Sequence, residues 1–476
     1  MNERPLPWGE FMRSLPPFVS EEAIDHEWFQ AVEALNRKII VLDDDPTGTQ
    51  TVHSIPVYTS WDADALRKIR REAFRVIYIL TNSRALKADT TRDLHRRIAR
   101  DLADVFIAEG DEILLISRSD STLRGHYPLE TETLYEELSR HTDIHGEILV
   151  PFFLEGGRLT CNDVHYVKED DVLTPAGKTE FAGDAVFGYR SSNLKEWIEE
   201  KTGGTYRATD VMAIPLEMLR ERNVAGVVKI LSDIDGFGKV VVNSVDYSDQ
   251  RVFVTALSQS LRQGKRFLFR TAASFVQVVG GIRPIPLLKK QALYPDGVSS
   301  DPGLVIVGSY VRKTTGQLEA LRDLSGITLI EWNVRQAKTD DCLKVESQRV
   351  IAEVEEAFAR GNDACVYTSR EYVSGGRGDE EELIFSQRVS EGLVRVVRDL
   401  TVHPGFLVAK GGITSSDVGV KGLAIARAMV MGQIQPGIPV WKLGAESRFP
   451  GLPYVVFPGN VGTDDTLKDV VEILRR

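Results

Sequence analysis

Long apolar runs and cysteines are both scarce in this chain of 476 residues. No stretch of 18 consecutive apolar residues occurs, so a membrane-spanning helix is not expected. The first residues, MNERPLPWGEFMRSLPPF, also lack the apolar core of an export signal. The cysteines are Cys161, Cys342 and Cys365, and no two of them stand at the spacing of a metal or redox site. These absences indicate a cytoplasmic protein without a membrane partner.

Positive charge is in deficit as well. The chain carries 58 Lys and Arg against 69 Asp and Glu, and its net charge of -11 repels phosphate backbones, so nucleic acid is not an expected partner. A small anionic substrate is still compatible with this charge, because a local arginine cluster outweighs a diffuse field within about 8 Å. No HExxH, GxSxG or GxxxxGK[ST] motif occurs, and no GxGxxG follows a strand. The sequence does not identify metal ligands.

The order of apolar runs indicates an α/β fold. Several short runs are each followed by a polar, glycine-bearing loop and a helical pattern, which is typical of mostly parallel sheets. The length favours two or three domains, and we expect two α/β domains facing a central cleft. A helix is expected at about 20–35. The expected strands are Lys38–Leu42, Arg75–Leu80, Glu112–Ile116, Glu147–Phe153, Val240–Val242, Arg266–Phe269, Leu304–Val307, Ala364–Tyr367, Phe406–Ala409 and Tyr454–Phe457.

Proline marks the boundary between the two halves. Pro284, Pro286, Pro295 and Pro302 fall in one short segment and do not fit the interior of regular elements. The predicted organisation is therefore an N-terminal extension (1–38), a first α/β domain (39–280), a linker (281–303) and a second α/β domain (304–476).

Three adjacent carboxylates, Asp43, Asp44 and Asp45, follow the first strand. Holding three adjacent carboxylates together costs free energy unless a cation, arginines or ligand hydroxyls offset their mutual repulsion. Asp44 or Asp45 could act as a general base, with Gly48 allowing close backbone approach. The alternative is that these carboxylates only cap a helix.

Arginines follow the other strands of the first half. Asn82, Ser83 and Arg84 follow the second strand, and the third and fourth strands are also followed by polar and charged side chains. Ligands of open α/β sheets bind at the carboxyl ends of strands, and arginine matches a carboxylate bidentately, so an acidic substrate is indicated. Surface ion pairs are the alternative for each arginine taken alone. After the third strand come Arg118, Asp120, Ser121, Thr122 and Arg124, and after the fourth strand come Gly157 and Arg158.

Glycine loops follow the strands of the second half. Free N–H groups at such a loop, placed before a helix, favour phosphate oxygens, although a glycine turn before a helix is also a common structural device. Gly308 and Ser309 make a smaller loop of this kind. The two larger loops contain Gly411, Gly412, Ile413 and Thr414 in one case and Gly459, Asn460 and Gly462 in the other.

Taken together and in order, these motifs resemble the four-carbon acid sugar kinase family. The motifs are LDDDPTGTQ, TNSR, RSDSTLRG, GGRLT, TPAGKTEFAGD, VGSYVRKTTGQL, AKGGITSSDVG, PGIPVWKLG and FPGNVGTDDTL. The family often has Lys at the place of Arg118, Ala at that of Thr49 and Ser-Gly-Asn-Phe-Gly at that of Pro458–Gly462, so the resemblance does not fix which substrate is used.

The resemblance implies an acid-sugar-binding first domain, an ATP-binding second domain, and phosphoryl transfer to a sugar hydroxyl. Threonate, erythronate and 3-oxo-tetronate are substrates of similar proteins. Carried over, the family's substrate residues are Asp44, Asp45, Gly48, Arg118, Asp120, Ser121, Arg124 and Arg158, and its nucleotide residues are Ser309, Gly411, Gly412, Ile413, Thr414 and Gly459.

Three hypotheses follow from the sequence. The first is a kinase that uses ATP and Mg²⁺, with Asp44 or Asp45 as the base and Asp120 as a further candidate. The second is a haloacid-dehalogenase-like phosphatase, because Asp43 to Thr47 spell D-x-D-x-T. The third is a sensor that binds both ligands without turnover. A homodimer is the default expectation for a soluble enzyme.

Overall fold

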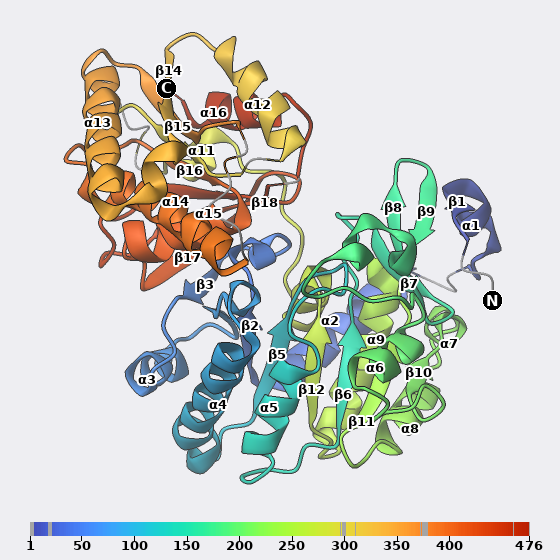
Figure 1. Cartoon of the computed structure of the whole chain (residues 1–476). Coiled ribbons are helices and arrows are strands. Elements are labelled where there is room, and N and C mark those ends of the chain that lie inside the picture. The colour runs from blue at the N-terminus through green and yellow to red at the C-terminus, as the bar shows by residue number, and fades with distance from the viewer. Residues whose placement is uncertain are drawn as a thin grey trace. The chain divides into compact units, whose positions relative to one another are not determined.

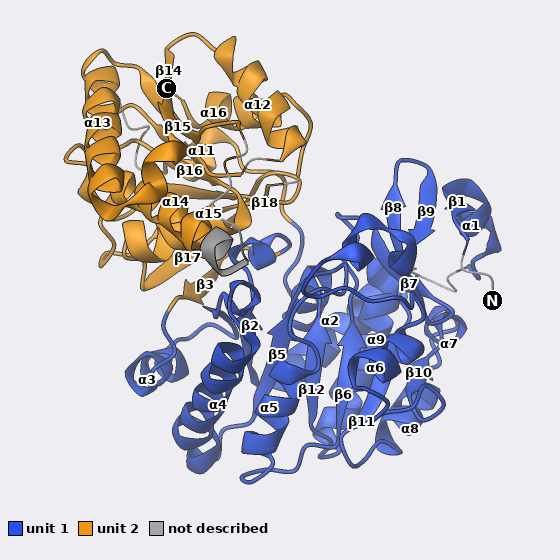
Figure 2. Ribbon diagram, in the orientation of Figure 1, with its two compact units in different colours: residues 1–51, 60–284 blue, residues 52–59, 285–476 orange. Residues whose placement is uncertain are grey.

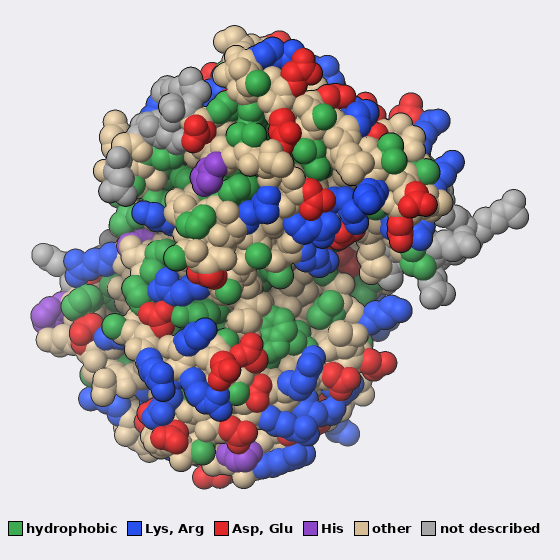
Figure 3. All heavy atoms as spheres, turned by 90° about the vertical axis from the view of Figure 1, so that its left-hand side faces the viewer, with side chains coloured by type: hydrophobic (Ala, Val, Ile, Leu, Met, Phe, Trp, Pro, Cys, Tyr) green, Lys and Arg blue, Asp and Glu red, His purple; other side chains and the backbone are tan. Residues whose placement is uncertain are grey.

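The computed structural model describes residues 4–17, 21–295, 297, 301–309, 311–371, 373, 379–459 and 461–475. The chain forms two compact units, shown in blue and orange in Figure 2: residues 1–51 and 60–284 make unit 1, and residues 52–59 and 285–476 make unit 2. Positive and negative side chains are interspersed over the face shown in Figure 3. None of the helices in the described part of the chain has the length and the apolar run that crossing a bilayer requires.

Unit 1 is built on a parallel sheet (Figure 1). Its strand order is β10-β11-β6-β12-β5-β2-β4, and each neighbouring pair is parallel. These strands are apolar along nearly their whole length, as expected of strands covered on both faces. The strands are β2 (Lys38–Asp43), β4 (Val76–Leu80), β5 (Ile113–Arg118), β6 (Gly146–Val150), β10 (Met212–Ile214), β11 (Gly238–Val242) and β12 (Phe267–Thr271).

Helices cover this sheet in two groups. The first consists of α3 (Ala63–Arg71), α4 (Ala88–Val105) and α5 (Leu129–Leu138), and the second packs around α9 (Tyr247–Arg262). Trp28 ties the N-terminal region to this second group, because its indole N–H donates to the Val278 carbonyl at 2.9 Å. The other helices are α2 (Glu21–Leu35), α6 (Leu194–Lys201), α7 (Leu216–Arg220), α8 (Val224–Ser232) and α10 (Ala273–Val279).

A small antiparallel sheet also belongs to unit 1. Its order is β1-β9-β8-β7, and its strands are β1 (Leu6–Pro7), β7 (Arg158–Cys161), β8 (Val164–Glu169) and β9 (Val172–Pro175). The short helix α1 (Trp8–Ser14) follows β1, and Phe11 packs against Tyr166 of β8 with ring centroids 6.1 Å apart. Residues of the predicted N-terminal extension therefore pair with this sheet.

Unit 2 contains a mixed sheet of order β3-β17-β18-β19-β16-β13-β15-β14. The pairs from β19 to β14 are parallel, and those from β3 to β19 are antiparallel. The strands are β3 (Ile55–Tyr58), β13 (Leu304–Val307), β14 (Ile327–Trp332), β15 (Asp363–Thr368), β16 (Leu407–Lys410), β17 (Arg427–Gln435), β18 (Ile438–Leu443) and β19 (Pro453–Phe457).

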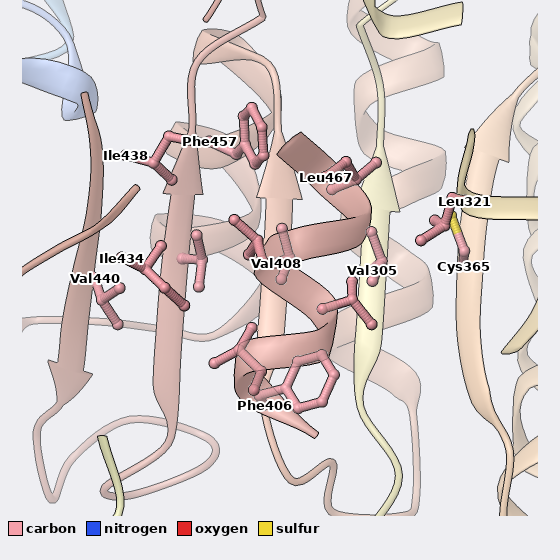
Figure 4. Close-up of a cluster of buried hydrophobic side chains, with 14 of the residues drawn as sticks. Val305, Leu321, Cys365, Phe406, Val408, Ile434, Ile438, Val440, Phe457 and Leu467 are labelled. Carbon is pink, nitrogen blue, oxygen red and sulfur yellow. The ribbon is translucent and has the colours of Figure 1, made fainter. Parts of the chain in front are cut away.

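One hydrophobic core of unit 2 lies between this sheet and helices α12 (Arg312–Arg322) and α16 (Thr466–Leu474). Figure 4 shows Val305 and Val408 from neighbouring strands beside Leu467 of α16, and all three are buried. Burial of such apolar side chains is the main force that holds sheet and helices together. The helices of the unit are α11 (Lys290–Leu293), α12 (Arg312–Arg322), α13 (Asp340–Ala359), α14 (Asp379–Asp399), α15 (Gly412–Asp417) and α16 (Thr466–Leu474).

The predicted fold class is confirmed, because the chain is α/β with mostly parallel sheets. All the expected strands are present, and the largest difference is at the end of β6, which stops at Val150 because Pro151 cannot donate to the ladder. Two antiparallel features were not predicted: the β7–β9 sheet and the β17–β18 hairpin. The placement of residues 52–59 in unit 2 was not predicted either.

Candidate functional site

The acidic loop, Asp44 to Gly48, follows Asp43, which is the last residue of β2 and is only 2% exposed. Arg118 Nη1 donates to its Oδ1 at 3.0 Å. Gly48 closes the other side, since a Cβ on Gly48 would lie 2.0 Å from Asp43 Oδ2. Burial raises the pKa of Asp43 to about 7, although the Arg118 charge opposes this rise. Asp43 is therefore enclosed by its own neighbours.

Asp44 is equally buried but is held in its charged form. Arg84 binds it bidentately, with Nη2 2.5 Å from Oδ1 and Nε 3.1 Å from Oδ2. The Ser119 hydroxyl donates to the same carboxylate at 2.5 Å. Burial raises the pKa of Asp44, but the charges of Arg84, Arg118 and Arg270 outweigh burial and lower the pKa below its ordinary value.

Asp45 caps the short 3₁₀ helix η1 (Pro46–Thr49). Its Oδ1 accepts hydrogen bonds from Thr47 N at 2.8 Å and from the Thr47 hydroxyl at 2.5 Å. The Arg84 guanidinium lies 3.5 Å from Oδ2. The capping role left open by the sequence thus applies to one oxygen of Asp45, while the other oxygen forms the longer ion pair with Arg84.

The loop after β5 forms a third charged group. Arg124 Nε donates to Asp120 at 2.7 Å, and the Thr122 hydroxyl donates to the same carboxylate. Burial raises the pKa of Asp120, but Arg84 and Arg124 lower it to a value well below the ordinary range. Ser121 is buried, and its carbonyl accepts from His165 Nε2 at 2.7 Å. Asp44 and Asp120 are therefore both ionised carboxylates surrounded by arginines.

Two arginines stand elsewhere than the sequence placed them. Arg118 is the last residue of β5 and does not lie in the following loop. Arg158 is the first residue of β7 in the small sheet and does not lie in the loop after β6. The guanidinium groups of Arg124 and Arg158 lie over the Phe181 ring, at 5.1 and 5.6 Å from its centroid. The small antiparallel sheet thus supplies a residue to the arginine cluster of unit 1.

The loop after β4 is arranged differently from its neighbours. Asn82 has a left-handed backbone, with φ 52°, and precedes the 3₁₀ turn η2 (Ser83–Ala85). Ser83 is fully buried, and its hydroxyl donates to Glu130 Oε1 at 2.6 Å. Within this loop, the Arg84 side chain binds Asp44 of the acidic loop, whereas the Ser83 hydroxyl is hydrogen-bonded to Glu130 of α5.

Sequence reasoning missed Glu130 of α5 and Arg270 of β12. Arg270 Nη1 donates to Glu130 Oε2 at 2.5 Å and to Ser117 Oγ at 3.2 Å, and Nη2 donates to the Arg124 carbonyl at 3.4 Å. Glu130 therefore contacts Ser83 of the loop after β4 directly and reaches the loop after β5 through Arg270. Arg270 follows a predicted strand, which is a usable signal, but nothing distinguishes Glu130 from other acids of an amphipathic helix.

In unit 2, Ser309, Gly411 and Gly459 converge. They follow β13, β16 and β19, which are adjacent strands. A Cβ on Gly459 would lie 3.1 Å from Ser309 Oγ, and one on Gly411 would lie 3.1 Å from Thr414 Oγ1. Gly411 has φ 119°, a conformation that favours glycine. The structure therefore brings together the glycine loops that the sequence singled out.

The remaining residues of this region take different positions. Gly412 begins α15, and the Ile413 side chain is 63% exposed. Lys410 is buried, and its ammonium group donates to the carbonyls of Pro458 at 3.1 Å and Gly459 at 3.4 Å. Burial, with a smaller contribution from the charge of Lys313, lowers the pKa of Lys410 to about 7. Asn460, also predicted to bind nucleotide, lies outside the described residues.

Two further side chains of unit 2 support the Ser309 loop and were not predicted. The Thr314 hydroxyl donates to Ser309 Oγ at 3.0 Å and to the Gly459 carbonyl at 3.2 Å. Arg370 Nη1 donates to the Ser309 carbonyl at 2.7 Å. Thr314 of α12 thus joins the loops after β13 and β19.

Comparisons with known proteins assign a description to each half. A family model described as a sugar-binding N-terminal domain matches residues 39–279, and one described as a nucleotide-binding C-terminal domain matches residues 304–467. No curated protein matches the chain.

Solved structures show the same fold. A Haemophilus influenzae protein of the family DUF1537 aligns with a TM-score of 0.58 at 17% identity, over 91% of this chain and 100% of its own. A proposed tRNA synthase from Salmonella typhimurium LT2 aligns with a TM-score of 0.64 at 14% identity, over 91% of this chain and 98% of its own. At these identities the likeness concerns the fold alone.

Proposed function

The chain belongs to the four-carbon acid sugar kinase family, and we propose that it transfers the terminal phosphoryl group of ATP to a hydroxyl of a small acid sugar such as threonate, erythronate or 3-oxo-tetronate. The observation that carries this proposal is the pairing of two sites in one chain. Unit 1 gathers arginines around carboxylates, and unit 2 gathers glycine loops at adjacent strand ends.

The arginine–aspartate pairs of unit 1 support binding of the sugar hydroxyls. Arg84, Arg118 and Arg124 each bind an aspartate, so they also fix the carboxylates that would meet the sugar hydroxyls. A fixed carboxylate accepts hydrogen bonds from hydroxyl groups without reorganising, which is the property that a positioning site needs. Unit 1 would then hold the sugar acid in one orientation.

We assign the general base to Asp45 before Asp44 or Asp120. The Asp44 side chain is 2% exposed and that of Asp45 is 18% exposed, so Asp45 is the more accessible of the two. The lowered pKa of Asp120, caused by Arg84 and Arg124 against the effect of burial, makes it a weak proton acceptor. Phosphoryl transfer depends mainly on positioning, so a modest base suffices.

The glycine loops of unit 2 support nucleotide binding. A side chain at Gly411 or Gly459 would crowd Thr414 or Ser309, and the bare backbone at these two glycines allows close approach of a phosphate. Among the described residues no three His, Cys, Asp or Glu side chains are grouped to hold a metal. This arrangement suits Mg²⁺ that the nucleotide phosphates themselves hold. Bound there, the ion would neutralise charge on the transferring phosphoryl group.

The phosphatase hypothesis fits the geometry less well. It needs Asp43 as an accessible nucleophile, but Asp43 is walled in by Arg118 and Gly48. Its pKa is also raised by burial to about 7, which reduces the nucleophilic anion at neutral pH.

Coupled measurement of ADP formation over a panel of acid sugars tests the proposal. The panel contains tetronates, their 3-oxo forms and branched-chain acids, each with ATP and Mg²⁺. We expect ADP to form only when one of these acids is present, and Asp45→Asn to reduce turnover more than Asp44→Asn. Release of phosphate from sugar phosphates without ATP would support the phosphatase instead, and binding of both ligands without ADP formation would support a sensor.

A further inference from the structure

The arginines of the unit 1 site differ in whether a carboxylate of the protein compensates their charge. Four of them form an ion pair with a carboxylate at 3.0 Å or less, so their charges are compensated within the protein. Arg158 has no carboxylate oxygen of the described residues within 4.0 Å. The compensated pairs are Arg84 with Asp44, Arg118 with Asp43, Arg124 with Asp120 and Arg270 with Glu130.

Arg158 is nevertheless partly buried. Its Nε is shielded from solvent and has no hydrogen-bond partner, and its Nη1 donates to the Gly156 carbonyl. Burial, together with the charge of Arg124, lowers the pKa of Arg158, although Asp120 and Glu169 oppose this. A guanidinium stays charged in such surroundings, so the free protein contains a positive charge that is poorly solvated and unpaired.

The surroundings of Arg158 belong to the candidate substrate site. Its guanidinium and that of Arg124 lie over the same Phe181 ring, and Asp120 acts electrostatically on both arginines. These residues come from the loop after β5, from β7 and from the 3₁₀ turn η5 (Glu180–Gly183). The unpaired charge therefore lies beside the carboxylates that would meet the sugar hydroxyls.

We propose that Arg158 receives the carboxylate of the acid sugar, whereas Arg84 and Arg118 hold aspartates in place. This assignment rests on the proposed function. A carboxylate bound to a guanidinium fork gains charge-assisted hydrogen bonds, and at Arg158 it displaces no existing ion pair. At Arg84 or Arg118 the same carboxylate would have to compete with Asp44 or Asp43.

The test compares Arg158→Gln with Arg190→Gln. Arg190 belongs to the same unit, and its side chain is 91% exposed, so its replacement removes the same charge from the surface. Steady-state kinetics are measured with the preferred acid sugar and with its uncharged amide. We expect Arg158→Gln to raise the KM for the acid by about 10- to 100-fold, to leave the KM for ATP within about twofold, and to abolish the preference for the acid over the amide. Arg158→Lys should fall between the two.

A second measurement separates loss of the ligand contact from loss of the fold. Because Arg158 is unpaired in the free protein, Arg158→Gln should keep the Tm of the wild type without ligand and lose the rise in Tm that threonate produces. An unchanged KM for the acid in Arg158→Gln would overturn the assignment, and so would a large fall in the Tm of the free variant.

Calorimetric titration with each acid of the panel in turn, without ATP, distinguishes this inference from the proposed function. Binding to the wild type that Arg158→Gln abolishes, without any ADP formation when ATP is added, would support Arg158 and contradict the kinase. Turnover that is insensitive to Arg158→Gln would support the kinase and contradict the assignment. Failure of the wild type to bind any acid sugar would contradict both.

Discussion

Arg270 Nη1 lies 2.5 Å from Glu130 Oε2, and both side chains are almost completely buried, at 7% and 1% exposure. The same glutamate accepts a hydrogen bond from Ser83, and Arg270 of β12 donates to the Arg124 carbonyl, so one residue of α5 supports the loops after β4 and β5. These loops carry Arg84, Asp120 and Arg124. The geometry of the proposed sugar site thus depends on an ion pair that lies behind it.

Glu130→Gln should therefore lower both stability and activity. The change leaves a buried guanidinium without its counter-charge, which costs about 3–5 kcal/mol in the free energy of unfolding. Urea denaturation measures this loss, and Glu136→Gln, on an exposed position of the same helix, is the control. Replacing Arg270 as well should recover part of the stability. A single variant as stable as the wild type would show that the pair does not hold the loops.

Gly48→Ala should disrupt the acidic loop. The new Cβ would meet Asp43 Oδ2 at 2.0 Å, and overpacking of this kind costs about 1–3 kcal/mol. Turnover with the acid sugar should fall with the loss of geometry around Asp44 and Asp45. Gly183→Ala is the matched control, because nothing lies within 4 Å of its added Cβ. Equal melting temperatures and activities of the two variants would contradict the packing seen at Gly48.

Asp43 should make the protein less stable as the pH rises toward neutrality. Burial raises the pKa of Asp43 from 3.8 to about 7, so between these values the folded protein binds a proton that the unfolded chain has lost. The contribution of Asp43 to the free energy of unfolding is present below about pH 4 and is lost as the pH rises to 7. Asp43→Asn has no such titration, so its stability relative to the wild type should increase between pH 4 and 7. A constant difference over this range would contradict the raised pKa.

Lys410 should have the opposite effect at higher pH. Burial lowers the pKa of Lys410 from 10.5 to about 7, so between these values the unfolded chain binds the additional proton. The free energy of unfolding should then rise from pH 7 to pH 10, and Lys410→Met should lose this slope. Lys344→Met, at an exposed position, is the control. Parallel pH profiles of the wild type and Lys410→Met would refute a buried, partly neutral lysine beneath the Gly459 loop.

Gly411→Ala should weaken nucleotide binding specifically. Gly411 has φ 119°, and its added Cβ would lie 3.1 Å from Thr414 Oγ1, so backbone strain of about 1–3 kcal/mol is combined with crowding of the loop. We expect the KM for ATP to rise about tenfold or more, with the KM for the acid sugar little changed. Gly361→Ala shares a positive φ, of 77°, but meets nothing within 4 Å. A similar rise in the KM for ATP in both variants would show that backbone strain alone, without crowding of the loop, causes the weaker binding.

Much of the fold could be predicted from local sequence, because strands such as Leu304–Val307 are continuous apolar runs that are followed by glycine. The convergence of Ser309, Gly411 and Gly459 follows from the same pattern, since the carboxyl ends of parallel strands meet at one edge of a sheet. Residues 52–59 could not be placed, because β3 pairs with β17, hundreds of residues later in the chain. No local signal encodes such a pairing.

The residue types of the site could be predicted from the sequence, but the pairing of its charged side chains could not. Arginines after strands indicated an acidic ligand, but which arginine is paired and which is free depends on contacts such as that of Arg118 with Asp43. Glu130 escaped notice because a buried glutamate in a helix looks like its exposed neighbours in sequence. Tertiary contacts, not periodicity, decide these points.

The most direct test of the central claim is ³¹P NMR of the wild-type protein incubated with ATP, Mg²⁺ and the acid sugars that bind it. We expect a new phosphomonoester resonance that grows in step with ADP and is absent when the acid sugar is omitted. ATP that remains unchanged in the presence of a bound acid sugar, or inorganic phosphate appearing in place of a sugar phosphate, would contradict it.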